Sequence, residues 1–218
     1  SGLPPRKDML AQDQRNEFSR ALREQLALPG IHSNDWADLF VTLAKQVQKG
    51  RVVILLDEIS WMAFGDSDFL GKLKTVWDTH FANNPKLMLI LCGSVSSWIE
   101  KNILSSTGYL GRPALHIRLQ ELPLVDCNQF WDSKKITAFE KLKMLAVTGG
   151  VPRYLELMNP SLTAEENIRS LCFSQNAALF TEYDRVFADV YDKRSEIYTR
   201  IVDYLVSHSP ALQEDISQ

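Results

Sequence analysis

Cysteine, long apolar runs and excess positive charge are all scarce in this 218-residue sequence, and each scarcity excludes a class of protein. The three cysteines, Cys92, Cys127 and Cys172, lie far apart, which argues against disulfides or a metal cluster and favours buried, reduced thiols. Apolar runs such as Val52–Leu56 are far shorter than the roughly 20 residues of a membrane-spanning helix. A formal net charge of −3 predicts no electrostatic footprint for nucleic acid.

The absence of other sequence patterns excludes further classes of protein. The four histidines are isolated and lack the spacing of zinc ligands, and the sequence contains no Gly-x-Ser-x-Gly motif of a hydrolase nucleophile. No charged-then-apolar secretion signal opens the chain, so we expect a cytoplasmic protein with no membrane partner. With 45% hydrophobic and 23% charged residues, the composition is that of an ordinary globular protein.

Helical and strand patterns alternate over the first 119 residues. Two continuous apolar runs are typical of parallel strands buried on both faces, and a third, alternating run resembles an edge strand. This alternation predicts an α/β fold with a parallel sheet flanked by helices. The expected helices are 8–26 (ended by Pro29 and Gly30), 33–50 (capped by Ser33 or Asn34), 66–81 and 97–104, and the expected strands are 51–59, 86–92 and 115–119.

Beyond Pro123 the strand patterns stop. Residues from about Cys127 to about Val190 have helical patterns that break at 149–152 and at 159–160, which predicts a helical lobe. The last stretch, 195–218, begins with another amphipathic helix.

The strongest local signal is the acidic pair Asp57-Glu58 at the end of the first apolar strand. Ligands of open parallel sheets bind outside the carboxyl ends of the strands, so both carboxylates are expected to point into that crevice. Hydrolysis of a nucleoside triphosphate needs one acid for the magnesium shell and another for the attacking water. The alternative is a strand that ends in two solvated acids.

Three other positions allow a functional and a structural interpretation. Ser94, after the second strand, could bond the attacking water or simply cap the next helix. Arg112, in a glycine-containing loop, could stabilise phosphoryl charge or be a plain surface arginine. The glycine pair at 149–150 exposes backbone that could approach a flat ring, or it forms only a turn between helices.

In this order the segments resemble the P-loop ATPases of the AAA+/STAND superfamily, in particular the archaeal-type ATPase family. Val53-Ile54-Leu55-Leu56-Asp57-Glu58 resembles a Walker B strand, and Leu89-Ile90-Leu91-Cys92-Gly93-Ser94 resembles the sensor-1 strand. Tyr109-Leu110-Gly111-Arg112 occupies the place of the arginine-finger loop, and Gly150-Val151-Pro152 is similar to the Gly-x-Pro turn.

The resemblance implies an incomplete P-loop core over 1–125, a helical lid over 126–192 and the start of a winged helix over 193–218. It implies ATP and magnesium as cofactors of the intact parent, with Asp57 toward the metal, Glu58 as general base, Ser94 as sensor and Arg112 as finger. It also implies that Gly150, Pro152 and Arg153 lie against the nucleotide, Pro152 against the adenine. Domains beyond Gln218 would read a nucleic acid or a protein effector.

One departure from the family pattern limits these expectations. No Gly-x-x-x-x-Gly-Lys-Ser/Thr loop occurs in the sequence, and in the family that loop precedes the point where this chain begins. We therefore expect a portion of an ATP-hydrolysing switch that by itself neither binds ATP tightly nor hydrolyses it. The lost strand would leave a sheet edge free for homo-oligomerisation. The alternatives are a non-catalytic protein-interaction module and a DNA-associated regulator, both using a relic nucleotide fold.

Overall fold

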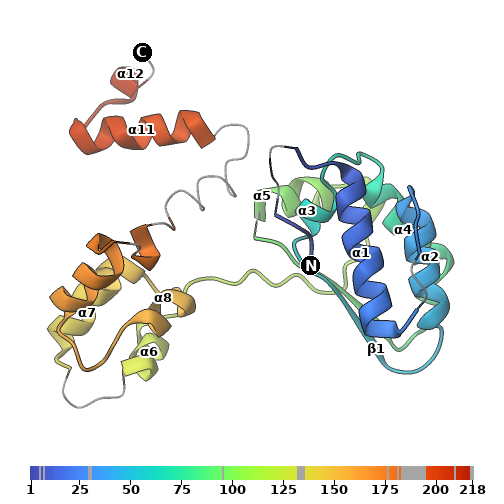
Figure 1. Cartoon of the computed structure of the whole chain (residues 1–218), viewed down its shortest axis with the longest axis horizontal. Coiled ribbons are helices and arrows are strands. Elements are labelled where there is room, and N and C mark those ends of the chain that lie inside the picture. The colour runs from blue at the N-terminus through green and yellow to red at the C-terminus, as the bar shows by residue number, and fades with distance from the viewer. Residues whose placement is uncertain are drawn as a thin grey trace. The chain divides into compact units, whose positions relative to one another are not determined.

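The computed structural model divides into two units, Ser1–Leu115 and His116–Gln218, each described here by itself (Figure 1). The structure describes all residues except 5, 7, 29–30, 95, 132–135, 176, 181, 183–194, 209 and 217–218. The expected helix end at 29–30 and the expected domain boundary at 192/193 lie outside the described residues, as does the end of the expected helical lobe. The division into core, lid and winged helix stays a prediction.

The first unit is a mixed α/β structure in which α2 packs against both α1 and α4 (Figure 1). The expected helices are present, and the side chain of Asp35, not Ser33 or Asn34, caps α2 by accepting a hydrogen bond from the Ala37 N–H at 2.8 Å. Its elements are α1 (Ala11–Leu26), α2 (Trp36–Gln46), β1 (Val52–Leu56), α3 (Ile59–Met62), α4 (Phe69–Thr79), η1 (Phe81–Asn83), β2 (Leu87–Leu91), α5 (Ser96–Ile99), the π-helical turn η2 (Glu100–Leu104) and η3 (Thr107–Tyr109).

The sheet has two parallel strands in the described part of the chain, β1 and β2, paired from Val52 opposite Leu87 to Leu56 opposite Leu91. Parallel pairing was predicted, but burial on both faces was wrong. Ile54 and Leu56 face the helices and are buried, whereas alternate residues face away and are exposed, because no described element of the first unit covers that side. The exposed set is Val53, Leu55, Met88 and Ile90.

The expected third strand, residues 115–119, is also wrong. These residues are not in a strand, and none of the described strands pairs with them. Leu115, Ile117 and Leu119 are 76%, 68% and 90% exposed. The alternating pattern is present, but a strand forms only where a neighbouring strand accepts its backbone hydrogen bonds.

An aromatic cluster fills the core between the helices of the first unit. Trp36, Phe40 and Phe69 are fully buried, and Phe18 of α1 packs edge-on against Trp36 and Phe40. Phe69 of α4 meets the Trp36 ring at 4.9 Å and 85°, a favourable edge-to-face geometry. This cluster fixes the helices that support the buried face of the sheet.

The elements described in the second unit beyond Pro123 are helices, as expected. A second apolar core forms around Trp131, Met144 and Leu155, each about 1% exposed. The described helices include none that is long and apolar enough to cross a membrane. The elements are α6 (Leu124–Cys127), η4 (Asn128–Trp131), α7 (Ala138–Thr148), α8 (Pro152–Leu157), α9 (Ala164–Ile168), η5 (Arg169–Phe173), α11 (Ser195–Ser207) and α12 (Gln213–Ile216).

Candidate functional site

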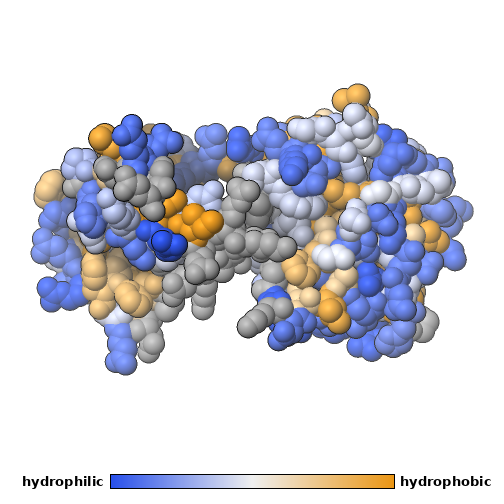
Figure 2. Space-filling view, turned by 90° about the horizontal axis from the view of Figure 1, so that it is seen from above, coloured by the Kyte–Doolittle hydropathy of each residue, from blue (hydrophilic) through white to orange (hydrophobic). Residues whose placement is uncertain are grey.

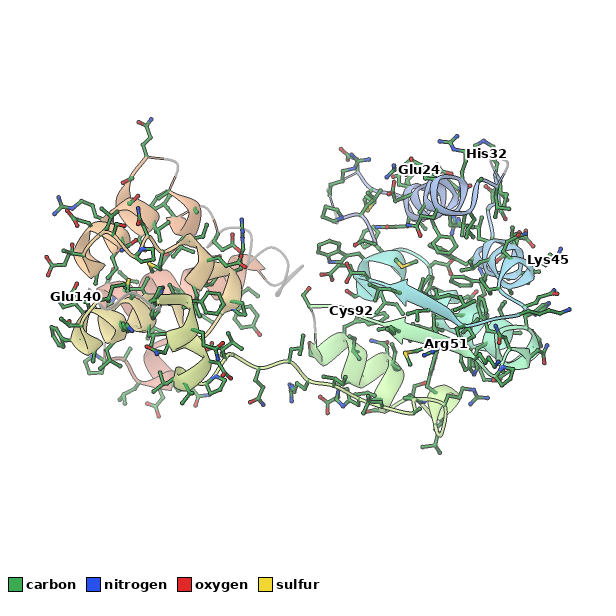
Figure 3. The ribbon with its side chains drawn as sticks, turned by 90° about the horizontal axis from the view of Figure 1, so that it is seen from below. Glu24, His32, Lys45, Arg51, Cys92 and Glu140 are labelled. Atoms are coloured by element: carbon green, nitrogen blue, oxygen red, sulfur yellow. The ribbon has the colours of Figure 1, made fainter. Side chains whose placement is uncertain are left out.

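The carboxyl ends of β1 and β2 meet at one edge of the sheet. Cys92 N–H donates to the Leu56 carbonyl at 2.9 Å, and Ile59 N–H donates to the Cys92 carbonyl at 2.9 Å. These bonds extend the ladder beyond the strands and place Asp57 and Glu58 beside residues 92–94. Figure 3 labels Cys92 just after β2 and Arg51 just before β1, at opposite ends of the sheet.

Glu58 has a left-handed backbone, with φ 51° and ψ 53°. Its carbonyl accepts hydrogen bonds from Trp61 N–H at 2.9 Å and Met62 N–H at 3.1 Å, which start α3. A residue other than glycine in this conformation costs about 1–2 kcal/mol. Such strain persists where the surroundings hold the residue in place, and it occurs preferentially at functional sites.

The Glu58 carboxylate is bonded to Ser94. Its Oε2 atom accepts from the Ser94 N–H at 3.3 Å and from the Ser94 hydroxyl at 3.1 Å. The structure therefore brings together the two side chains that sequence reasoning selected from separate strands. Both bonds go to Oε2, and no bond to Oε1 from any described residue is found, so Oε1 can accept a hydrogen bond from water.

Cys92 was missed as a member of this group. It is exposed rather than buried as expected, whereas Cys127 is buried. Partial burial raises the pKa of the Cys92 thiol, and a hydrogen bond with the Asp57 carboxylate raises this pKa further. The sequence signal for Cys92 is its position at the end of the second apolar run, since Asp57 follows the first run. In the structure the pairing of Leu56 with Leu91 puts Asp57 opposite Cys92.

Arg112 is bonded elsewhere in the first unit. Its Nε and Nη2 atoms donate to the two Asp78 oxygens at 2.9 and 2.8 Å, and Nη1 donates to the Gly108 carbonyl at 2.9 Å. Hydrogen bonds from Arg112 and then from Lys74 lower the pKa of Asp78 to about 2. Asp78 was not selected from the sequence because its partner is 34 residues away. This geometry is that of an anchor joining the 108–112 loop to α4.

Gly150, Pro152 and Arg153 belong to the second unit, where each has a local role. Leu122 N–H donates to the Gly150 carbonyl at 2.8 Å, and a Cβ atom at Gly150 would clash with the Leu122 carbonyl oxygen. Pro152 occupies the first turn of α8, where its missing N–H costs nothing. Arg153 is exposed, and its Nη1 atom lies 3.5 Å from the Glu156 Oε2 atom.

The donor atoms at the strand ends suit magnesium better than a transition metal. Asp57 and Glu58 offer hard carboxylate oxygens, and magnesium in phosphate-transferring sites is held by one or two carboxylates together with substrate phosphates and water. Among the described residues, no group of three or more His, Cys, Asp or Glu side chains could enclose a metal by itself. The two carboxylates therefore offer ligands of the type that magnesium prefers, and the described residues add no third ligand of this kind.

Comparisons with known proteins do not indicate a function for this chain. No family model, no curated protein and no solved structure matches this chain. The contacts at the carboxyl ends of β1 and β2 are therefore the features of this chain that point to a function.

Proposed function

We propose that this chain supplies the water-activating half of a magnesium-dependent nucleoside triphosphate hydrolase site, as part of a switch of the AAA+/STAND kind built on an incomplete P-loop core. The single observation that carries the proposal is the bonding of Glu58 to Ser94 across the ends of two parallel strands. This is the position where open parallel sheets place their ligands. The preceding Asp57 adds the second carboxylate that the chemistry requires.

Each residue has a distinct task in this proposal. Glu58 accepts a hydrogen bond from the attacking water at Oε1 and takes its proton, while Ser94 fixes the carboxylate through Oε2. Asp57 would hold a magnesium ion through one of the ion's water ligands. When bound, a magnesium ion would supply charge neutralisation of the transferring phosphoryl group.

The phosphate-holding half has no counterpart in the sequence, which lacks a Gly-x-x-x-x-Gly-Lys-Ser/Thr loop. Backbone amides of that loop and its lysine normally hold the phosphates. We therefore expect the 218-residue chain to bind ATP too weakly for calorimetry and to hydrolyse none. Micromolar ATP binding by this chain would contradict this expectation.

The decisive experiment measures ATP turnover by any longer natural form of the protein that is found to carry such a loop. Glu58→Gln keeps the size of the side chain but removes the base, so we expect turnover to fall by about 10²–10⁴-fold. Glu24→Gln makes the same chemical change on the exposed end of α1 and should leave turnover unchanged. Equal rates for the Glu58→Gln variant and wild type would remove Glu58 as the base.

A second candidate, a protein-interaction module, is favoured by the uncovered face of the sheet. Val53, Leu55 and Met88 are 66%, 56% and 58% exposed, and Ile90 is 39% exposed. Figure 2 shows other apolar residues at the surface among hydrophilic ones, but these four lie together because the register pairs them. Parallel sheets are normally covered on both faces, so a contiguous apolar face of this kind indicates a partner.

The partner in this second candidate is another copy of the chain. Packing of the two sheets face to face about a two-fold axis would bury the four apolar side chains of each copy against those of the other. Light scattering should then give a dimer for wild type and a monomer for Ile90→Lys, with Val206→Lys as an exposed apolar control. A monomeric wild type would contradict this packing.

A further inference from the structure

The segment Ser1–Leu3 lies against the acidic end of β1. Gly2 is buried, and its N–H donates to the Asp57 carbonyl at 2.9 Å. The next residue is held from α1: the Gln14 amide accepts from the Leu3 N–H at 2.9 Å and donates to the Leu3 carbonyl at 2.8 Å. Gln14 is only 2% exposed, and its amide bonds to this backbone and, through Nε2, to the Met9 Sδ atom at 3.2 Å.

No side chain fits at Gly2. A Cβ atom there would lie 2.8 Å from the Glu58 carbonyl oxygen, 2.9 Å from Met62 N and 2.9 Å from the Trp61 Cβ. Two of these three atoms belong to the backbone that begins α3, and none is the end of a flexible side chain. The segment therefore packs directly on the peptide that follows Glu58.

The left-handed conformation of Glu58 is fixed from both sides by these contacts. On one side Ile59 N–H is bonded to the Cys92 carbonyl of the neighbouring strand end at 2.9 Å. On the other side Gly2 is bonded to Asp57 and touches the Glu58 carbonyl. A strained residue relaxes unless its surroundings determine its conformation, and here the second support is the 1–3 segment.

We propose that Gly2 and Leu3, clamped by Gln14, form a positioning segment that keeps Glu58 in its left-handed conformation with its carboxylate on Ser94. The idea that this matters for hydrolysis rests on the proposed function, whereas the conformational effect does not. Gly2 and Gln14 are positioning residues, because they act through the backbone of residues 57–58 and not on a substrate.

The test uses NMR spectroscopy of the 218-residue chain. Positive φ gives a strong Hα–HN cross-relaxation signal within Glu58, and the Ser94 amide shift reports its bond to the Glu58 carboxylate. We expect both Gly2→Ala and Gln14→Met to weaken the Glu58 signal and to shift the Ser94 amide. Gln14→Met keeps the volume of the side chain while removing both bonds to Leu3, so it decides the matter if Gly2→Ala does not fold.

Gly71→Ala is the matched control, since a Cβ at this position of α4 meets no atom within 4 Å. It should leave both Glu58 and Ser94 signals unchanged. Folded Gly2→Ala and Gln14→Met proteins with wild-type signals at both residues would overturn the positioning role.

A separate measurement distinguishes this failure from a failure of the proposed function. Titration of the wild-type chain with Mn²⁺ alone should broaden the amide signals of Asp57 and Glu58, because carboxylate oxygens bind this ion. In the Gln14→Met protein this broadening should weaken. Absence of broadening in wild type would count against the hydrolase proposal and would leave the conformational result standing.

Discussion

Replacing Gly150 with alanine separates a structural role of the glycine pair from a nucleotide-binding role. Gly150 is buried against the backbone of Leu122, whose N–H donates to the Gly150 carbonyl at 2.8 Å. The Gly150 N–H donates to Glu121 Oε2 at 3.1 Å. An added Cβ would lie 2.8 Å from Leu122 N and would clash with the Leu122 carbonyl oxygen, so the two backbones must separate.

The size of the effect follows from the two bonds lost on separation. A backbone hydrogen bond contributes a net 0.5–1.5 kcal/mol and one to a charged group about 1.5–3 kcal/mol, so the second unit should lose roughly 2–4 kcal/mol. With a urea m-value of about 1 kcal/mol/M for a unit of this size, its unfolding midpoint should fall by roughly 2 M or more. Because the clash involves backbone atoms, a rotamer change cannot relieve it.

The assay is urea unfolding followed by backbone NMR signals of α7, with those of α2 in the first unit as an internal reference. We expect Gly150→Ala to lower the α7 midpoint and to leave the α2 midpoint in place. Glu121→Gln, which removes only the charge that accepts from Gly150, should lower the α7 midpoint less. An unchanged α7 midpoint for Gly150→Ala would refute the reasoning and would favour a role of Gly150 in approaching a ligand.

Two further predictions concern the first unit. Because the pKa of Asp78 is lowered from 3.8 to about 2, the stability from its bonds to Arg112 is fully present above pH 4 and is lost as the pH falls toward 2. The difference in urea midpoint between wild type and Asp78→Asn should therefore shrink over that interval, and a constant difference would contradict the ion pair. Phe69→Ala should cost about 3–5 kcal/mol in chemical unfolding, because it empties a fully buried site between Trp36 and Phe40, whereas a loss below 1 kcal/mol would show that the cluster closes over the gap.

Much of the first unit could be predicted from local patterns. The period of apolar residues located α1, α2 and α4, and continuous aliphatic runs located β1 and β2, because each pattern reflects which side of an element is buried. The same runs predicted burial on both faces, which was wrong, since a run of apolar residues does not say whether a second layer is present. The third strand failed for a related reason: alternation at 115–119 supplies no pairing partner.

In the candidate site, too, some residues could be selected from the sequence and others only from the structure. Asp57, Glu58 and Ser94 could be selected from the sequence because each lies within two residues of the end of an apolar run, and the parallel pairing of those runs brings them together. The bonding of Arg112 to Asp78 could not be selected, because a contact over 34 residues depends on how α4 and the 108–112 loop pack. The positive φ of Glu58 and the packing of Gly2 against residues 57–62 could likewise not be predicted from the sequence.

The sequence by itself determined the main helices and the two strands of the first unit and the acidic strand end, because periodicity and strand ends are local properties of the chain. Tertiary structure alone decided which polar groups meet: Glu58 with Ser94, Arg112 with Asp78, and Gln14 with the backbone of Leu3. Hydrogen bonds require distances near 3 Å and suitable angles, and these are set by the packing of several elements at once.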